Sequence, residues 1–148
     1  MEECISKHGL PALFLLSFLA STLIPLGSEW LLIALIAKGL PVTPLVITAT
    51  TGNFLGACTT YAIGLWGSTL LIDKVLRLDR KKVEQAVTLY SKYGCWSLLF
   101  SWLPIIGDPL CLAAGLLKLK LPLFAGLVVV GKLGRYAAVA AITTASLG

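Results

Sequence analysis

Two acids in this sequence lie beside long apolar runs. Glu29 closely follows the run Leu10–Ile24, and Asp108 closely follows the apolar stretch that ends at Leu103. A carboxylate inside a hydrophobic run is costly to bury, so it needs a partner or serves a function. In such a place it can hold a cation, a proton or a basic side chain. We therefore take Glu29 and Asp108 as candidate binding residues.

Two cations lie in a third apolar segment. Lys132 and Arg135 are three residues apart within Leu121–Leu147, so they share one face of a predicted helix. An unpaired Arg at the centre of a bilayer costs about 2.5–3.5 kcal/mol on insertion scales. We therefore predict that Arg135 or Lys132 pairs with one of the two acids. The pair could be purely structural, or the cations could hold a phosphate, whose oxygens suit the planar fork of Arg.

Each acid follows a predicted break in a helix. Proline and glycine interrupt helices, and both occur within a few residues before each acid. Asp108 fits the N-cap of the helix that follows, with Pro109 at its first position. Helix N-termini carry partial positive charge and attract anions. The predicted hairpin tips contain Pro25, Gly27, Ser28, Pro104 and Gly107.

The same pattern occurs twice in the chain. One spacing relates Pro25 to Pro104, Glu29 to Asp108, and Gly52 to Gly131. An internal repeat of this kind sets the fold. We predict a single membrane domain over 1–148, with repeat 1 over 6–72, a connector over 73–92 and repeat 2 over 91–148. Asn53 matches Lys132 in this alignment, and it is a further candidate for the same site.

The composition is that of a polytopic membrane protein. The chain has 148 residues, of which 57% are hydrophobic and 13% charged, whereas soluble domains carry about 25% charged residues. Its mean hydropathy is +0.91. We expect an all-α fold in which two long helices span the bilayer, Leu45–Leu71 and Leu121–Leu147. Glu2 and Glu3 precede the first apolar run in place of a basic leader, so we expect this run to be retained and not cleaved as a signal peptide.

Four shorter apolar arms flank the predicted tips. Arms of about 8–15 residues reach only about 12–22 Å, whereas the bilayer core is about 30 Å thick. We therefore expect two re-entrant hairpins that turn back inside the membrane. Their arms are Leu10–Ile24, Trp30–Ala37, Cys95–Leu103 and Pro109–Leu117.

Basic residues gather between the two repeats. The chain has a formal net charge of +5, and six of its Lys and Arg residues lie between Lys74 and Lys92. The positive-inside rule places this segment on the cytoplasmic side. Apolar residues recur there at helical spacing, which favours an amphipathic helix on the membrane surface over a solvated connector. Both termini then lie outside, and the two repeats are inverted relative to each other, as in many transporters.

Several kinds of function are not expected. No nucleophile stands in a pattern with the single histidine, His8, so we do not expect an enzyme. The four cysteines lack metal-ligand or redox spacing and fit packing positions, so we expect no metal or cofactor. The basic cluster does not belong to a soluble domain, so we do not expect the protein to bind nucleic acid.

Several motifs together cover nearly the whole chain: Pro25-Leu-Gly-Ser-Glu29, Gly52-Asn-Phe-Leu-Gly56, Ser101-Trp-Leu-Pro-Ile-Ile-Gly-Asp108, Leu112-Ala-Ala-Gly115 and Gly131-Lys-Leu-Gly-Arg-Tyr136. They resemble those of the DedA superfamily of membrane proteins, in particular its small YqaA-type branch. The resemblance implies two re-entrant hairpins that face each other, and residence in a bacterial inner membrane. Several members are implicated in moving polyprenyl phosphates and phospholipids across the bilayer, with an ion gradient as a coupling partner. Larger members typically carry Arg where this chain has Ser101 and Gly107.

The sequence thus favours a membrane transporter for an anionic lipid, with membrane lipids as its partners. Two alternatives remain open. An ion-coupled carrier of a small solute shares every feature, and a non-transporting membrane protein could use the same charges only to hold its hairpins together.

Overall fold

The computed structural model describes residues 2–21, 27–67, 80–102 and 107–148, and every regular element in these ranges is helical. The all-α prediction is therefore confirmed. The predicted tip residues Pro25 and Pro104, and positions 73–79 of the connector, lie outside these ranges. The elements in chain order are α1 (Glu2–Ala20), α2 (Gly27–Ala37), α3 (Val42–Trp66), α5 (Arg80–Tyr93), the 3-10 helix η1 (Gly94–Trp102), α6 (Gly107–Leu116) and α7 (Leu121–Leu147).

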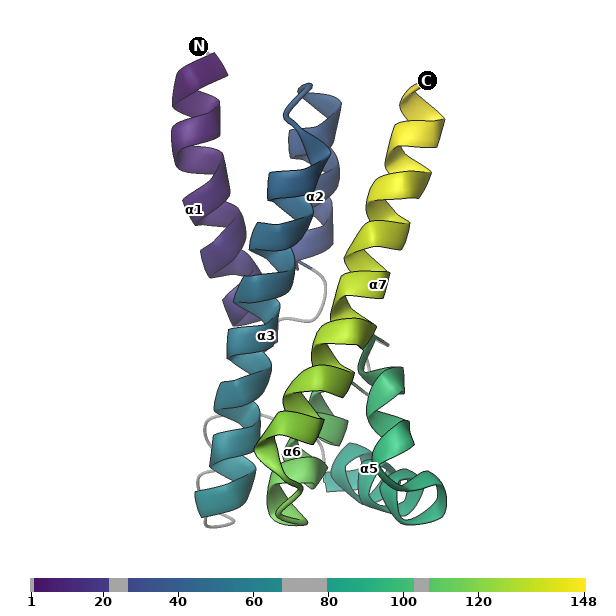
Figure 1. The fold of residues 1–148 in the computed structure, drawn as a ribbon. Helices are drawn as coiled ribbons and strands as arrows, with labels where there is room; N and C mark the ends of the chain where they lie inside the picture. Colours follow the sequence, from purple (N-terminus) through teal and green to yellow (C-terminus); the bar gives the residue numbers. More distant parts are fainter. Residues whose placement is uncertain (1, 22–26, 68–79, 103–106) are drawn as a thin grey trace.

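Two long helices, α3 and α7, run the full height of the bundle (Figure 1). The elements α1 and α2 lie beside them at the end where α1 begins and α7 ends, which we call the terminal half. The elements η1 and α6 lie beside them in the opposite half, with α5 across its end (Figure 1). We call this the far half. The end of α1 and the start of α6 therefore approach the same middle level of α7 from opposite directions.

The short helices α2 and α6, one in each half, end in the same kind of reversing turn. After α2, Gly39 has a φ of 84°, and the amide of Leu40 donates to the carbonyl of Leu35 at 3.2 Å. After α6, Lys118 has a φ of 54°, and the amide of Leu119 donates to the carbonyl of Ala114 at 3.0 Å. Both are helix C-terminal motifs closed by a left-handed residue. Glycine adopts this conformation without strain, whereas Lys118 adopts it at some cost.

Some helix boundaries differ from the sequence-based expectations. Helix α1 begins at Glu2, so it starts eight residues before the arm expected over Leu10–Ile24. The arm expected over Cys95–Leu103 is a 3-10 helix, η1, and not an α-helix. Helix α6 begins at Gly107, so Asp108 lies within its first turn and not at the N-cap.

The long helices differ in how apolar they are. Within the described ranges, α7 is the one helix both long and apolar enough to cross a membrane by length and composition. Helix α3 has 25 residues, about 37 Å at 1.5 Å per residue, and carries no charge. Its threonines and Asn53 lower its hydropathy, so the expected spanning character of Leu45–Leu71 does not appear by the same measure.

Glycines let the backbone of α3 approach two neighbours closely. A Cβ on Gly52 or Gly56 would lie 2.5 or 2.6 Å from a carbonyl oxygen of α1. In the far half, a Cβ on Gly64 would collide with Leu112 O of α6, and one on Gly115 would collide with Tyr61 O. All four approaches are closer than van der Waals contact, so only glycine fits. Gly52 and Gly56 thus admit the backbone of α1, and Gly64 and Gly115 bring α3 and α6 together.

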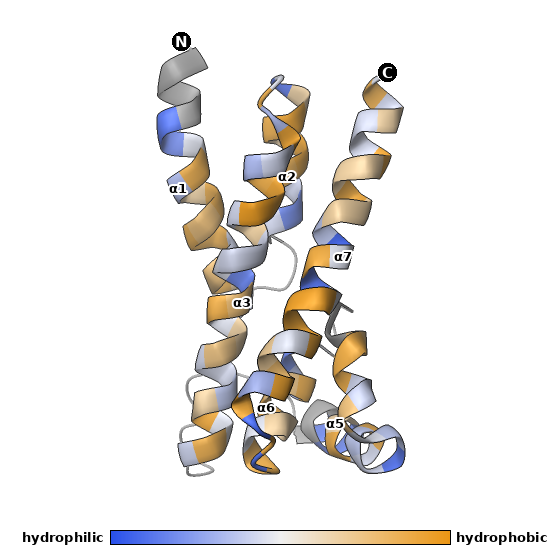
Figure 2. Cartoon of the chain, in the orientation of Figure 1, coloured by the Kyte–Doolittle hydropathy of each residue, from blue (hydrophilic) through white to orange (hydrophobic). Residues whose placement is uncertain are grey.

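The bundle has an apolar core in each half and an apolar surface. Leu13, Leu32 and Tyr136 belong to the core of the terminal half, and Leu98 and Phe124 to that of the far half. Many large hydrophobic side chains are also exposed, including Trp30, Trp66 and Ile142. Apolar residues therefore cover much of the outer faces of the long helices (Figure 2). A surface of this kind is suited to lipid, since water would penalise it.

Candidate functional site

The middle of α7 carries the charged site, and Arg135 is its outer member. The Arg135 guanidinium forms an ion pair with the Glu29 carboxylate, which lies in the first turn of α2. The side chain of Arg135 is 11% exposed and that of Glu29 is 24% exposed. The Arg135 guanidinium also lies over the ring of Tyr136, 6.0 Å from its centroid. Helix α2 is thereby joined to α7 by an ion pair.

Lys132 lies one turn away and is more deeply buried, with 2% of its surface exposed. Its Nζ is 3.9 Å from Asp108 Oδ1, in the first turn of α6. The same Nζ donates a hydrogen bond to Asn53 Oδ1 of α3. A buried ammonium needs such partners, because an unpaired charge in an apolar core is strongly unfavourable. Each cation of α7 thus has one acid, and each acid belongs to a different half of the bundle.

Tyr136 connects the two charge pairs. Asn53 Nδ2 donates to Tyr136 Oη at 2.7 Å, and Ser28 Oγ lies 2.8 Å from the same oxygen. Tyr136 is fully buried, so its hydroxyl depends on these partners. Ser28 directly precedes Glu29 in the sequence. A series of polar side chains therefore extends from the Arg135–Glu29 pair through Ser28, Tyr136 and Asn53 to the Lys132–Asp108 pair.

A second link joins the two halves without α7. Ser21, just after the end of α1, donates to Asp108 Oδ1 at 3.1 Å. Thr60 of α3 donates to the backbone carbonyl of Ser21 at 3.4 Å and to that of Gly56 at 3.2 Å. The end of α1 and the start of α6 therefore meet at one carboxylate, which Lys132 also approaches.

The structure thus brings together the candidate residues that sequence reasoning selected. Arg135 and Lys132 each lie beside an acid, and Asn53 accepts a hydrogen bond from Lys132. Of the predicted tip residues, Gly27 begins α2, Ser28 bonds Tyr136, and Gly107 is buried at the start of α6.

Tyr136 and Ser21 are members that the sequence did not reveal as site residues. One signal was available for Ser21: it stands four residues after Ser17 in an apolar run, and residues spaced in this way share one helix face.

The arrangement is suited to binding charged groups. It holds two cations, two carboxylates, an amide and two types of hydroxyl in one buried region. Within the described ranges, no group of three or more His, Cys, Asp or Glu residues could hold a metal ion. The cations can attract an anionic group such as phosphate, and the carboxylates can attract a cation.

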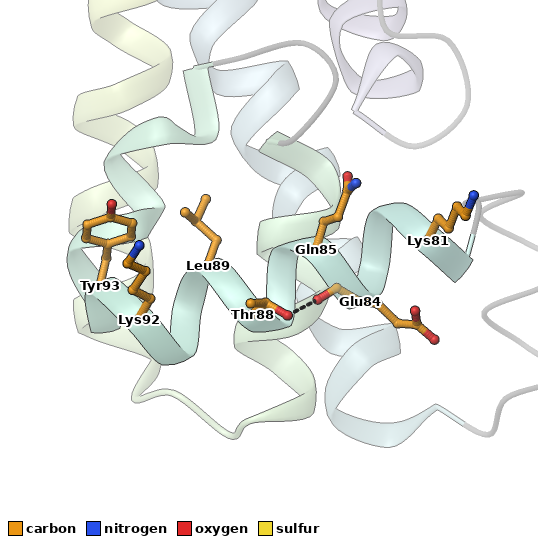
Figure 3. A pocket seen from close by; sticks show the side chains of 7 residues that line it. All are labelled: Lys81, Glu84, Gln85, Thr88, Leu89, Lys92 and Tyr93. Atoms are coloured by element: carbon orange, nitrogen blue, oxygen red, sulfur yellow. Dashed lines mark hydrogen bonds between the residues drawn. The ribbon is translucent and has the colours of Figure 1, made fainter.

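A separate hollow lies at the surface of α5 and is distinct from this network. It measures about 580 Å³ and is lined by α5 side chains such as Gln85, Leu89 and Tyr93 (Figure 3). Helix α5 is amphipathic, as predicted: Ala86 is fully buried in the far-half core, whereas Thr88 and Lys92 are exposed. The hollow therefore belongs to the outer face of this helix.

Comparison with known proteins gives the family. Residues 24–145 match the model of the VTT domain. The chain is 38% identical over 144 residues to the inner membrane protein YqaA of Escherichia coli, which covers 97% of this chain and 94% of that protein. It is equally similar to the inner membrane protein YqaA of Shigella flexneri. An uncharacterized protein of Haemophilus influenzae is 33% identical over 147 residues, covering 93% of this chain and 88% of that protein. No solved structure matches the chain significantly. With the match extending over most of its length, this chain belongs to the VTT-domain (DedA) family of membrane proteins.

Proposed function

We propose that this chain is a transporter of the bacterial inner membrane that moves a lipid with an anionic headgroup across the bilayer, coupled to a proton or cation gradient. The observation that carries the proposal is the buried position of Lys132 and Arg135 at the point where the two hairpins converge on α7. A purely structural bundle has little need for two cations at its centre, because apolar side chains would fill that space at lower cost.

The proposed membrane topology has two inverted repeats. In each repeat a short hairpin re-enters the bilayer and one long helix crosses it. The opposite directions of α1–α2 and η1–α6 support this arrangement, as does the shared reversal at Gly39 and Lys118 (Figure 1). Broken helices that meet at mid-depth between inverted repeats are a common architecture of transporter binding sites.

The proposed orientation places α5 at the cytoplasmic surface of the inner membrane. The name of the Escherichia coli relative supports the inner membrane. The buried apolar side and exposed Lys92 of α5 fit a helix lying among anionic headgroups, and the basic composition of 73–92 fits the cytoplasmic side.

The proposed mechanism exchanges partners at α7. In the present arrangement, Glu29 and Asp108 neutralise Arg135 and Lys132. When an acid takes up a proton or another cation, its partner on α7 is released and can bind a headgroup phosphate. When the acid returns to its anionic form, it competes with the phosphate and favours its release. Binding of the headgroup and loading of the acid are thereby coupled.

A flip assay in proteoliposomes tests this function. A labelled polyprenyl phosphate and a labelled phospholipid are followed for the wild type, Arg135→Ala and Asp108→Asn, at matched folding. Lys120→Gln is the matched control, because Lys120 is exposed at the start of α7 and outside the network. We expect wild-type and control proteins to move at least one lipid, and both site variants to lose at least tenfold in rate.

The outcomes separate the alternatives. Movement that needs both residues supports lipid translocation and identifies the preferred headgroup. If the folded wild type moves neither lipid, the lipid proposal fails, and a small-solute carrier or a structural role takes its place.

A further inference from the structure

Among the described buried Ser and Thr side chains, two lack a hydrogen-bond partner within the protein. Several helical Ser and Thr side chains donate to the carbonyl four residues earlier in their own helix. Thr51 bonds Ile47 O at 2.7 Å and Thr143 bonds Val139 O at 2.8 Å. Such back-bonding satisfies a hydroxyl without any outside partner. Ser17 of α1 and Thr50 of α3 do not use it: their hydroxyl oxygens are buried and make no hydrogen bond to described residues.

The two unpartnered hydroxyls occupy related places. Ser17 precedes Ser21 by four residues, and Ser21 bonds Asp108. Thr50 precedes Asn53 by three residues, and Asn53 bonds Lys132 and Tyr136. Residues three or four apart share a helix face. Each free hydroxyl therefore lies one turn from a member of the charged network, on the side toward the terminal half.

The far half differs from the terminal half in how its buried hydroxyls are bonded. Its core is apolar, with Ala57, Leu98 and Ala113 fully buried. The buried hydroxyls near it are satisfied within the protein: Ser97 donates to Gly94 O at 2.8 Å, and Thr60 donates to two carbonyls. Among the described residues, unpartnered buried hydroxyls are therefore confined to the terminal side of the charged network.

We propose that Ser17 and Thr50 bind water inside the terminal half, and that this water hydrates the charged network from that side alone. Buried polar groups in proteins are nearly always hydrogen-bonded, and internal water supplies the partner where protein does not. Ser17 is fully buried and Thr50 is 7% exposed, so bulk solvent cannot do so. The hydrated side gives Asp108, through Ser21, an approach for protons or small cations, while the far side stays dry. The proposal holds whatever the cargo of the protein is.

Cysteine labelling tests the proposed sites. In a chain whose four native cysteines are replaced by Ala, single cysteines are placed by Ser17→Cys, Thr50→Cys, Ala57→Cys and Ala113→Cys. The last two are the matched controls, since both positions are fully buried in the far half. A small, charged, membrane-impermeant thiosulfonate is applied to vesicles of known orientation, from the side that exposes the C-terminus to protease.

We expect the cysteines at 17 and 50 to react at least tenfold faster than those at 57 and 113, because a thiol ionises and meets the reagent only in water. Equal rates at all positions, in folded variants, would overturn the proposal.

A second measurement uses the unmodified protein, so it decides the matter even where a cysteine variant fails to fold. Radiolytic hydroxyl-radical labelling, detected by mass spectrometry, marks side chains beside bound water. We expect label in the segments around Ser17 and Thr50 to exceed that around Ala57 and Ala113 severalfold. Equal labelling of the two sets of segments would contradict the proposal that internal water lies on one side of the network only.

Discussion

Replacing Glu29 by Gln removes the negative charge beside Arg135 while keeping the shape of the side chain. The Arg135 side chain is 11% exposed, so its guanidinium cannot recover its hydration without moving. Breaking a buried ion pair by removing one partner costs about 3–5 kcal/mol. A lone Arg at the middle of a membrane helix costs about 2.5–3.5 kcal/mol on insertion scales.

Two features reduce the expected cost. The amide that replaces the carboxylate keeps one oxygen that accepts a hydrogen bond from the guanidinium. Glu29 is also 24% exposed, so part of the pair is already screened. We therefore expect Glu29→Gln to destabilise by about 2–3 kcal/mol, a change of roughly 30- to 150-fold in the ratio of folded to unfolded protein.

The double variant Glu29→Gln with Arg135→Gln provides the decisive comparison. It leaves no unpaired charge, so we expect its stability to return to within about 1 kcal/mol of wild type. Steric trapping in bicelles measures the free energy of reversible unfolding for each single variant and for the double variant. Lys120→Gln is the surface control. If Glu29→Gln matches wild type, or if the double variant loses the sum of the single losses, the ion pair has no energetic role and the reasoning is wrong.

Other positions give sharp expectations. Gly115→Ala drives a Cβ into Tyr61 O, so we expect it to lower the melting temperature by several degrees, at a cost of about 1–3 kcal/mol. Gly134→Ala is its control, because nothing lies within 4 Å of the added Cβ, and we expect a gain of about 0.5–1 kcal/mol from helix propensity. Equal melting shifts for the two would contradict the close packing of α3 on α6. Tyr136→Phe leaves the Asn53 amide without its acceptor and Ser28 without its partner, so unfolding in bicelles should show a loss of about 1–3 kcal/mol; an unchanged value would mean that the network tolerates the loss.

The sequence predicted the charged site better than the shapes of the helices. Spacing alone related Glu29 to Asp108 and Asn53 to Lys132, and the cost of a buried charge required the cations to meet the acids. The structure contains both pairs. Their role in binding a substrate remains a prediction, because a static arrangement of charges does not by itself reveal what they bind.

Other features depend on contacts that one sequence does not contain. Tyr136 joins the network because α2 and α3 present Ser28 and Asn53 to its hydroxyl, and no local pattern encodes that meeting. The helical start at Glu2 was missed because its polar residues have no hydrophobic periodicity. The 3-10 form of η1 was missed because an apolar run has the same composition in either helix type.

The glycine contacts of α3 have a mechanical consequence. A helix whose backbone touches its neighbours at Gly52, Gly56 and Gly64 cannot slide or rotate against them without collision. Helices α1, α3 and α6 therefore behave as one rigid frame that extends through both halves. Helix α7 meets that frame through side chains such as Lys132 and Tyr136, whose rotamers can change. We therefore expect a change of shape in this bundle to occur as movement of α7 and α2 relative to this frame, with the side chains of the charged network rearranging between them.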